Sequence, residues 1–184
     1  MTRTDRRVER SRASVLAETY RLLVEVGISG VSIDEISRRS GIAKTTIYRQ
    51  WASRSALLLD ACSQLGTAAE IPDTGTVAGD LAALVRDLAH ALALPGWPTV
   101  LPSIIDAAER DPDTARLHEM LHAGMMSPFH TVVARGFARG ELSSDRDPSE
   151  VVAAVTGPLF YRRWFSREPI DDAFLAAVLR TATR

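Results

Sequence analysis

The residues in this chain that most directly suggest chemistry are His118, Glu119 and His122, which match the pattern H-E-x-x-H. On a helix this spacing brings two imidazoles one turn apart on the same face, with a carboxylate beside them. Zinc peptidases use the two histidines of such a motif as metal ligands and the glutamate as general base. The motif therefore raises the hypothesis of a zinc-dependent hydrolase.

The sequence around the motif weakens that hypothesis. The extended form of the signature needs Gly at position 125 and His at position 128, where this chain has Met125 and Pro128. The near candidate for a third ligand is Glu141, just past the end of a predicted helix. With Cys62 as its single cysteine, the chain cannot build a four-cysteine or Cys₂His₂ zinc site. Because so short a match recurs by chance, catalytic zinc stays a minor alternative, and we expect no metal or cofactor.

Composition and charge are those of an ordinary globular protein with an uneven charge distribution. The 184 residues are 46% hydrophobic and 24% charged. The charged N-terminus predicts no secretion signal, and no stretch approaches the roughly 20 apolar residues that span a bilayer, so a cytoplasmic protein is expected. Residues 1–60 carry 11 Lys or Arg and 7 Asp or Glu, a net charge of +4, whereas residues 61–184 carry 11 and 16, a net charge of −5. The basic first third favours contact with a polyanion.

Helical periodicity dominates the sequence, and no period-2 run predicts a strand, so we expect an all-α fold of about nine helices. In the first helix, apolar residues recur at spacings of three and four until Gly27. Ser32 and Glu35 predict a capping box for a short helix over residues 33–40, which Gly41 ends. A third helix follows after about three residues.

The rest of the chain predicts a separate set of helices. A break containing Pro and Gly near residues 70–76 predicts a domain boundary there, between the first four helices and those that follow. Among the later helices, Pro128 and Pro158 predict kinks, because the proline ring removes a backbone hydrogen bond and clashes with the preceding turn.

The second and third helices, joined by a tight turn at Gly41, form a helix-turn-helix arrangement. The third helix is short enough to lie in a major groove of duplex DNA, with its N-terminal residues at the base edges. We expect Ile42, Ile47 and Trp51 to face inward. The side chains left for the nucleic acid are Lys44, Thr45, Thr46, Tyr48 and Arg49.

The segment SIDEISRRSGIAKTTIYRQWASRSALL resembles the DNA-binding segment of the TetR family of transcriptional regulators. The turn at residues 41–43, the run at residues 44–48, the aromatic residue at 51 and the basic Arg54 fall where that family has them. The resemblance is strongest over residues 12–60, and the tail GPLFYRRWFSREPIDDAFL resembles one subtype of the family's second domain. Two departures are Ala43, where a capping Ser is frequent, and Trp51, where Phe is usual.

The resemblance implies a helix-turn-helix DNA-binding domain at residues 1–55 and a helical ligand-binding and dimerisation domain at residues 56–184. It implies a homodimer that binds a palindromic double-stranded DNA operator. The favoured expectation is a repressor that a small apolar or amphipathic effector releases from the operator. The alternatives are the zinc hydrolase and a helical small-molecule-binding protein without specific DNA binding.

The resemblance also implies roles for individual residues. Base and nearby phosphate contacts fall to Lys44, Thr45, Thr46 and Arg49, with Arg49 the candidate for guanine. Phosphate contacts fall to Ser32, Tyr48 and Arg54. The N-terminal arm is a further candidate source of phosphate or minor-groove contacts, through Arg3, Arg6, Arg7, Arg10 and Arg12.

Two further sets concern the second domain. The candidates for a ligand pocket are His118, His122 and the apolar side chains Trp97, Met126, Phe129, Phe160 and Trp164. For the apolar side chains, packing in the core is the alternative interpretation. The candidates for dimerisation through the last two helices are Leu159, Phe160, Phe174, Ala177 and Val178. For each of these five, burial within its own chain is the equal alternative.

Overall fold

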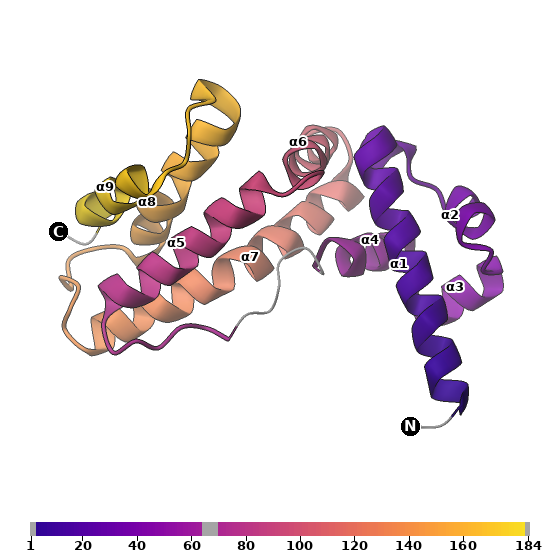
Figure 1. Ribbon diagram of the computed structural model, residues 1–184, viewed down its shortest axis with the longest axis horizontal. Helices are drawn as coiled ribbons and strands as arrows, with labels where there is room; N and C mark the ends of the chain where they lie inside the picture. Colours follow the sequence, from indigo (N-terminus) through magenta and orange to yellow (C-terminus); the bar gives the residue numbers. More distant parts are fainter. Residues whose placement is uncertain (1–2, 64–69, 183–184) are drawn as a thin grey trace. The chain divides into compact units, whose positions relative to one another are not determined.

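The computed structural model describes residues 3–63 and 70–182, and all the regular structure in those ranges is helical (Figure 1). The all-α prediction is thereby confirmed for the described part of the chain, with nine α-helices and one π-helical turn. In chain order the elements are α1 Arg3–Gly30, α2 Ile33–Ser40, α3 Lys44–Gln50, α4 Arg54–Ser63, α5 Val77–Ala93, α6 Trp97–Ala108, α7 Pro112–Ala138, α8 Pro148–Tyr161, η1 Arg162–Ser166 and α9 Asp172–Ala182. No helix among the described residues is long and apolar enough to cross a membrane.

The helices form two compact units that do not follow chain order. Residues 1–67 and 95–122 make the first unit, which holds α1 to α4, α6 and the start of α7. Residues 68–94 and 123–184 make the second unit, which holds α5, the rest of α7, α8, η1 and α9. The functional division into residues 1–55 and 56–184 stays a prediction.

In the first unit, α1 packs against α2, α4 and α6 (Figure 1). Gly27 interrupts α1 with φ 65° and ψ 177°, a conformation that favours glycine. The interruption frees backbone groups, and the N–H of Ile28 donates to Ser103 Oγ on α6 at 3.3 Å. The hydroxyl of Tyr20 donates to the carbonyl of Pro95 at 3.1 Å. Polar contacts therefore join α1 both to α6 and to the segment just before it.

The boundaries of α2 follow from its capping residues. Ser32 Oγ accepts a hydrogen bond from the N–H of Glu35 at 3.2 Å, and Gly41 adopts the left-handed conformation with φ 69°. The Glu35 carboxylate does not complete the predicted capping box. It pairs with Arg38 and Arg39 one turn later.

The second unit has an apolar core to which α5, α7, α8 and α9 all contribute. The side chains of this core that are completely inaccessible are Leu81, Leu92, Val132, Val133, Val151, Val155 and Leu159. One buried carboxylate accompanies them. Asp80 accepts hydrogen bonds from the N–H and the hydroxyl of Thr74, at 2.5 and 2.8 Å, and lies 3.5 Å from Arg139 Nη2. Burial acts to raise the pKa of Asp80, but the bonds from Thr74 and Arg139 outweigh it and lower that pKa.

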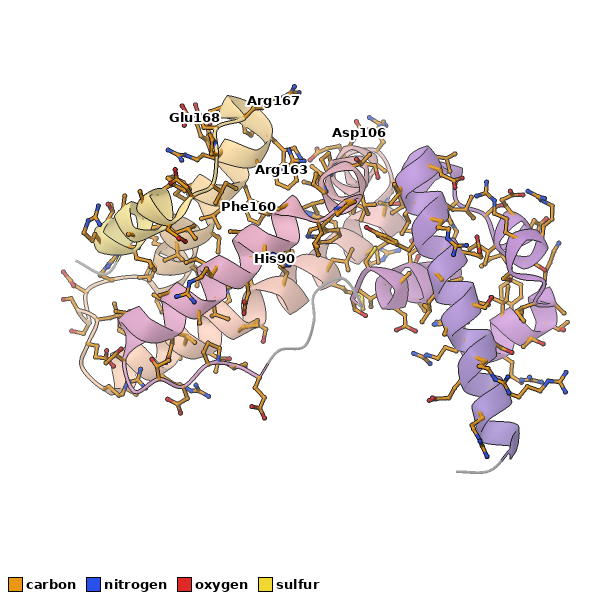
Figure 2. The ribbon with its side chains drawn as sticks, viewed as in Figure 1. His90, Asp106, Phe160, Arg163, Arg167 and Glu168 are labelled. Carbon is orange, nitrogen blue, oxygen red and sulfur yellow. The ribbon has the colours of Figure 1, made fainter. Side chains whose placement is uncertain are left out.

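The chain accommodates differently the two prolines for which the sequence predicted kinks. α7 continues through Pro128 as one helix. Downstream of Pro158, α8 passes into the π-helical turn η1, which the sequence analysis did not anticipate. Arg163, labelled in Figure 2, donates from Nε to the carbonyl of Leu92 at 3.1 Å and thereby fixes η1 to the end of α5.

Candidate DNA-binding surface

α3 is a seven-residue helix held against the first unit by one side only. Ile47 is its one buried residue, and Trp51, which follows the helix as its C-cap, is 5% exposed. Both inward positions agree with the pattern of the sequence. A helix this short is not stable alone, so its orientation depends on the contacts of its inner side.

The outer side of α3 is polar and accessible. Lys44, Thr45 and Arg49 are exposed, Tyr48 keeps 55% of its surface exposed, and Thr46 is half-buried. The structure therefore brings these five predicted residues together on one short element. Cation, hydroxyl and phenol groups on a helix of this size suit the acceptors of DNA bases and phosphates.

The N-terminal end of α3 lies next to a carboxylate from α2. Lys44 Nζ is 2.5 Å from Asp34 Oδ1, and both side chains are more than half exposed. Because Asp34 would repel a phosphate, this ion pair lowers the positive charge of the surface in the free protein. Asp34 was not among the predicted residues of this surface, because its contact with Lys44 depends on how α2 and α3 pack.

Ser32 and Arg54 differ in how much of each side chain is left for DNA. Ser32 is exposed at the start of α2, and its oxygen serves as the cap while its hydroxyl hydrogen can still donate outward. Arg54 is half-buried: Nε donates to the carbonyl of Val31 at 2.9 Å and Nη2 donates to that of Ile28. Burial lowers the pKa of Arg54. Its guanidinium joins α4 to the link between α1 and α2, and this geometry gives no support to the predicted phosphate contact.

The arginines of the N-terminal arm also divide into two kinds. Arg6, Arg7 and Arg10 are exposed on α1, whereas the side chain of Arg3 lies outside the described residues. Arg12 Nη2 donates to Asp60 Oδ2 on α4 at 2.5 Å. Arg12 is therefore engaged within the first unit.

The sequence matches two family models that together cover most of the chain. Residues 15–61 match "Bacterial regulatory proteins, tetR family", and residues 71–182 match "Tetracyclin repressor-like, C-terminal domain". The chain belongs to the TetR family. It is a helix-turn-helix transcriptional regulator, as its sequence indicated, and the helix-turn-helix is α2 and α3.

Relatives and solved structures in the TetR family agree with this assignment over nearly the whole chain. The DNA-binding transcriptional repressor TetR of Mycobacteroides abscessus is 32% identical over 179 residues, which are 94% of this chain and 92% of that protein. The crystal structure of the TetR family transcription regulator SCO0332 superposes with a TM-score of 0.71 at 30% identity, covering 93% of this chain and 95% of the other. FadR from Bacillus subtilis, solved in complex with stearoyl-CoA, gives a TM-score of 0.71 at 14% identity over 93% and 97% of the two chains, and this likeness is one of fold alone.

The predicted ligand-pocket residues are divided between the two units of this TetR-family chain. Trp97, His118 and His122 belong to the first unit, and the other four belong to the second. Met126 and Phe129 are buried in the core of the second unit, where Phe160 and Trp164 stack with ring centroids 5.7 Å apart. For Met126 and Phe129 the geometry favours the core-packing interpretation.

The H-E-x-x-H motif lies on α7 without the rest of a zinc site. The rings of His118 and His122 have centroids 6.4 Å apart and an interplanar angle of 46°. Glu119 and His122 are exposed. Within residues 3–63 and 70–182, no group of three His, Cys, Asp or Glu side chains is arranged to hold a metal ion. The zinc-hydrolase alternative therefore has no structural support.

Proposed function

We propose that this TetR-family regulator binds a pseudo-palindromic operator as a homodimer, represses transcription there, and is released by a small apolar or amphipathic effector. One seven-residue helix contacts too few base pairs for useful specificity, so two copies are needed. An effector that binds the DNA-free form more tightly shifts the equilibrium by its differential affinity. A coupling of about 1–3 kcal/mol would loosen DNA binding about 5- to 150-fold. The proposed place of action is the cytoplasm.

The observation that carries the DNA-binding role is the exposed polar side of α3 around a single buried residue. In the proposed complex Arg49 makes a bidentate contact to guanine, and Lys44, Thr45 and Thr46 contact bases or nearby phosphates. Tyr48 and Ser32 donate to phosphates. We leave Arg54 out of this set, because its guanidinium already donates to two backbone carbonyls.

The first test is selection from a random duplex library at near-physiological salt with the wild type, Arg49→Ala and Arg86→Ala. Arg86 is an exposed arginine on α5 and controls for the loss of one positive charge. The wild type and Arg86→Ala should enrich the same palindrome. Arg49→Ala should bind that palindrome about 100-fold more weakly, because each of two copies loses a contact of about 1–3 kcal/mol. An absence of any enriched sequence with the wild type would contradict the proposal.

The proposed dimer forms through the exposed side of α8, η1 and α9. Leu159 and Val178, two of the predicted interface residues, are 0% and 7% exposed inside their own unit, so their apolar surface is already covered. The exposed positions repeat every four residues along α8 and η1, at Ala153, Gly157, Tyr161 and Phe165. Tyr161 and Phe165 stack with centroids 5.7 Å apart and keep 60% and 78% of their surfaces exposed. Aromatic surface of this kind at the end of a small-residue stripe suits a second copy of the same helices.

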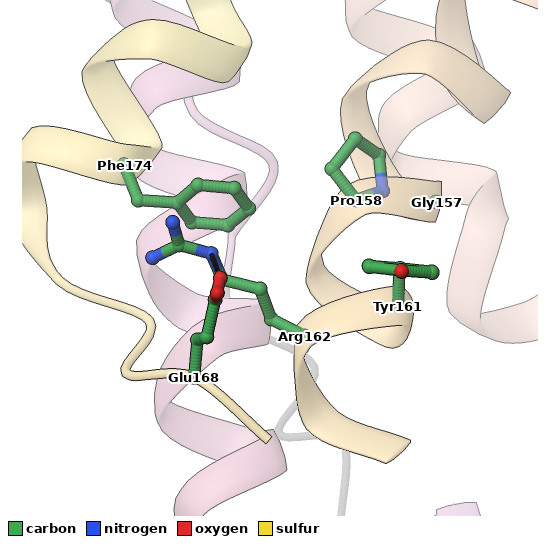
Figure 3. Close-up of a pocket in the computed structure, with 6 residues that line it drawn as sticks. All are labelled: Gly157, Pro158, Tyr161, Arg162, Glu168 and Phe174. Atoms are coloured by element: carbon green, nitrogen blue, oxygen red, sulfur yellow. Dashed lines mark ion pairs between the residues drawn. The ribbon is translucent and has the colours of Figure 1, made fainter. Parts of the chain in front are cut away.

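A shallow pocket of about 520 Å³ adjoins this stripe (Figure 3). The ring of Phe174 on α9 lines the pocket, and the guanidinium of Arg162 lies 3.7 Å from the ring centroid. Glu168 pairs with Arg162 at 3.4 Å. Phe174, half-buried and in the pocket wall, therefore remains in the proposed interface, unlike Val178.

Sedimentation equilibrium tests the dimer. Tyr161→Glu should shift the protein from dimer toward monomer, because two carboxylates would be buried across the two-fold axis. Met120→Glu, which changes another apolar residue that is 56% exposed, serves as the control and should leave the dimer intact. A Tyr161→Glu protein that stays fully dimeric would exclude this stripe as the interface.

A further inference from the structure

We propose that Asp60 is a positioning residue for DNA recognition, because its Oδ2 atom joins Trp51 at the end of α3 to Arg12 on α1. The inference rests on the proposed DNA-binding role of α3. Asp60 lies on α4 and does not contact DNA in the proposed complex. Its role is to set the orientation of α3.

One carboxylate oxygen receives both contacts of this clamp. Trp51 Nε1 donates to Asp60 Oδ2 at 2.8 Å, and Arg12 Nη2 donates to the same oxygen at 2.5 Å. The Arg12 guanidinium carbon also lies 5.4 Å from the centroid of the Trp51 ring. The end of α3, the helix α4 and the distant helix α1 therefore meet at one atom.

Apart from the exposed ion pair between Lys44 and Asp34, α3 has few other means of fixing its orientation. Ala43 supplies no side-chain cap at its start, and Ile47 is its one buried residue. Apolar contact through Ile47 and the Trp51 ring holds α3 on the unit but is not directional. Hydrogen bonds weaken steeply away from their preferred angles, so the indole N–H and the carboxylate restrict rotation of the helix about its buried side.

The environment of the clamp makes these contacts effective. Trp51 is 5% exposed and the side chain of Asp60 is 21% exposed, so water competes weakly for the indole N–H and only in part for the carboxylate. An indole N–H that lost its acceptor there would be buried without a partner. Asp60 therefore couples the position of Trp51 to α1, the helix that carries the exposed arm arginines.

The variants that test the clamp are Asp60→Leu, which has a similar shape and no acceptor, and Asp60→Asn, which keeps an acceptor for Trp51 but loses the charge that attracts Arg12. The control is Asp106→Leu on α6 of the same unit (Figure 2). It removes a carboxylate that forms an exposed ion pair with Arg110. It reproduces the change in net charge, which by itself strengthens DNA binding without regard to sequence. Circular dichroism and thermal melting establish a temperature at which the wild type and all three variants are folded.

The first readout needs no DNA. Hydrogen–deuterium exchange over residues 44–51 should be about tenfold faster in Asp60→Leu than in Asp106→Leu, with Asp60→Asn between them, while exchange in α5 and α9 stays unchanged. Equal exchange rates in α3 of the folded Asp60→Leu and Asp106→Leu proteins would overturn the clamp.

The second readout is the affinity for the selected operator and for each single-base variant of it. Asp60→Leu should bind the operator about tenfold more weakly than Asp106→Leu and discriminate less at every base that α3 reads, because the whole helix is displaced. A purely structural role predicts a lower melting temperature with unchanged base preference in the folded protein, and that result would overturn the proposal. If the wild type selects no operator, the proposed function fails, and the exchange experiment still decides whether Asp60 fixes α3.

Discussion

The two units of this protein hold their helices in different ways. The second unit is built around a continuous apolar core shared by α5, α7, α8 and α9, with Asp80 as a fully bonded polar exception. In the first unit, α1 packs against α4 and α6, and all three helices bury apolar residues, but α3 is attached through Ile47, Trp51 and a set of polar contacts. The contrast indicates that the helix that meets DNA is oriented by directional bonds, whereas the second unit is stabilised by burial.

This difference has a physical reason. Apolar burial supplies free energy roughly in proportion to area and tolerates small shifts, so it suits a scaffold. Base recognition depends on the position of a few donors to within a fraction of an ångström, and hydrogen bonds specify position more sharply than apolar contacts do. A substitution should therefore affect stability in one unit and recognition in the other.

The largest expected effect on this contrast comes from Leu81→Ala in the second unit. Leu81 is 0% exposed, and the lost burial together with the remaining cavity should lower the free energy of unfolding by about 3 kcal/mol. Urea denaturation at fixed protein concentration measures this loss. Operator affinity of the folded variant should stay within about twofold of the wild type. Leu94→Ala, at a position 38% exposed, is the control. A large loss of affinity in fully folded Leu81→Ala would show that the contrast is wrong.

A smaller effect, a gain in DNA affinity instead of a loss of stability, should follow Asp34→Asn on the DNA-binding surface. Removal of this carboxylate frees Lys44 and removes a repulsion from phosphate, so duplex affinity should rise about threefold at low salt with little change in stability. Fluorescence anisotropy with a labelled duplex gives the affinity. Asp106→Asn makes the same change in net charge on α6. An equal gain in duplex affinity with this variant would mean that net charge alone causes the effect.

The smallest effect should be the acid sensitivity that Glu35 contributes to the first unit. Hydrogen bonds from Arg38, and then from Arg39, lower the pKa of Glu35 from 4.5 to about 2. A carboxylate with a lowered pKa in the folded state stabilises that state fully above its unfolded pKa and loses this contribution as the pH falls toward the folded value. Glu35→Gln should therefore flatten the pH dependence of stability between about pH 4.5 and pH 2, as measured by urea midpoints. An unchanged slope in this window would mean that the Arg38 and Arg39 contacts add nothing in solution.

Local signals in the sequence predicted the helix-turn-helix closely. Ser32 as a cap and Gly41 as a left-handed terminus define α2, and the missing cap at Ala43 is seen at the start of α3. Each of these features depends on residues within one turn of each other. The inward positions of Ile47 and Trp51 followed from helical spacing in the same way.

Local sequence patterns did not predict contacts between residues that are distant in the sequence. The phosphate contact of Arg54 stays a prediction, and local patterns gave no sign that its guanidinium donates to carbonyls more than twenty residues earlier. The partners of Asp60 lie 9 and 48 residues before it. Spacing on one helix also could not decide which apolar side of α8 faces inward, so Leu159 was proposed for an interface although it is buried in the core.

The division of the chain into two discontinuous units has a consequence for its synthesis. The first unit needs residues 95–122 as well as residues 1–67. Ser103 on α6 accepts a hydrogen bond from Ile28 of α1, and Pro95, just before α6, accepts one from Tyr20. When residues 1–67 have left the ribosome, the surface of α1 that later contacts α6 is still uncovered. The first unit therefore cannot finish folding until α5, a helix of the other unit, has already emerged.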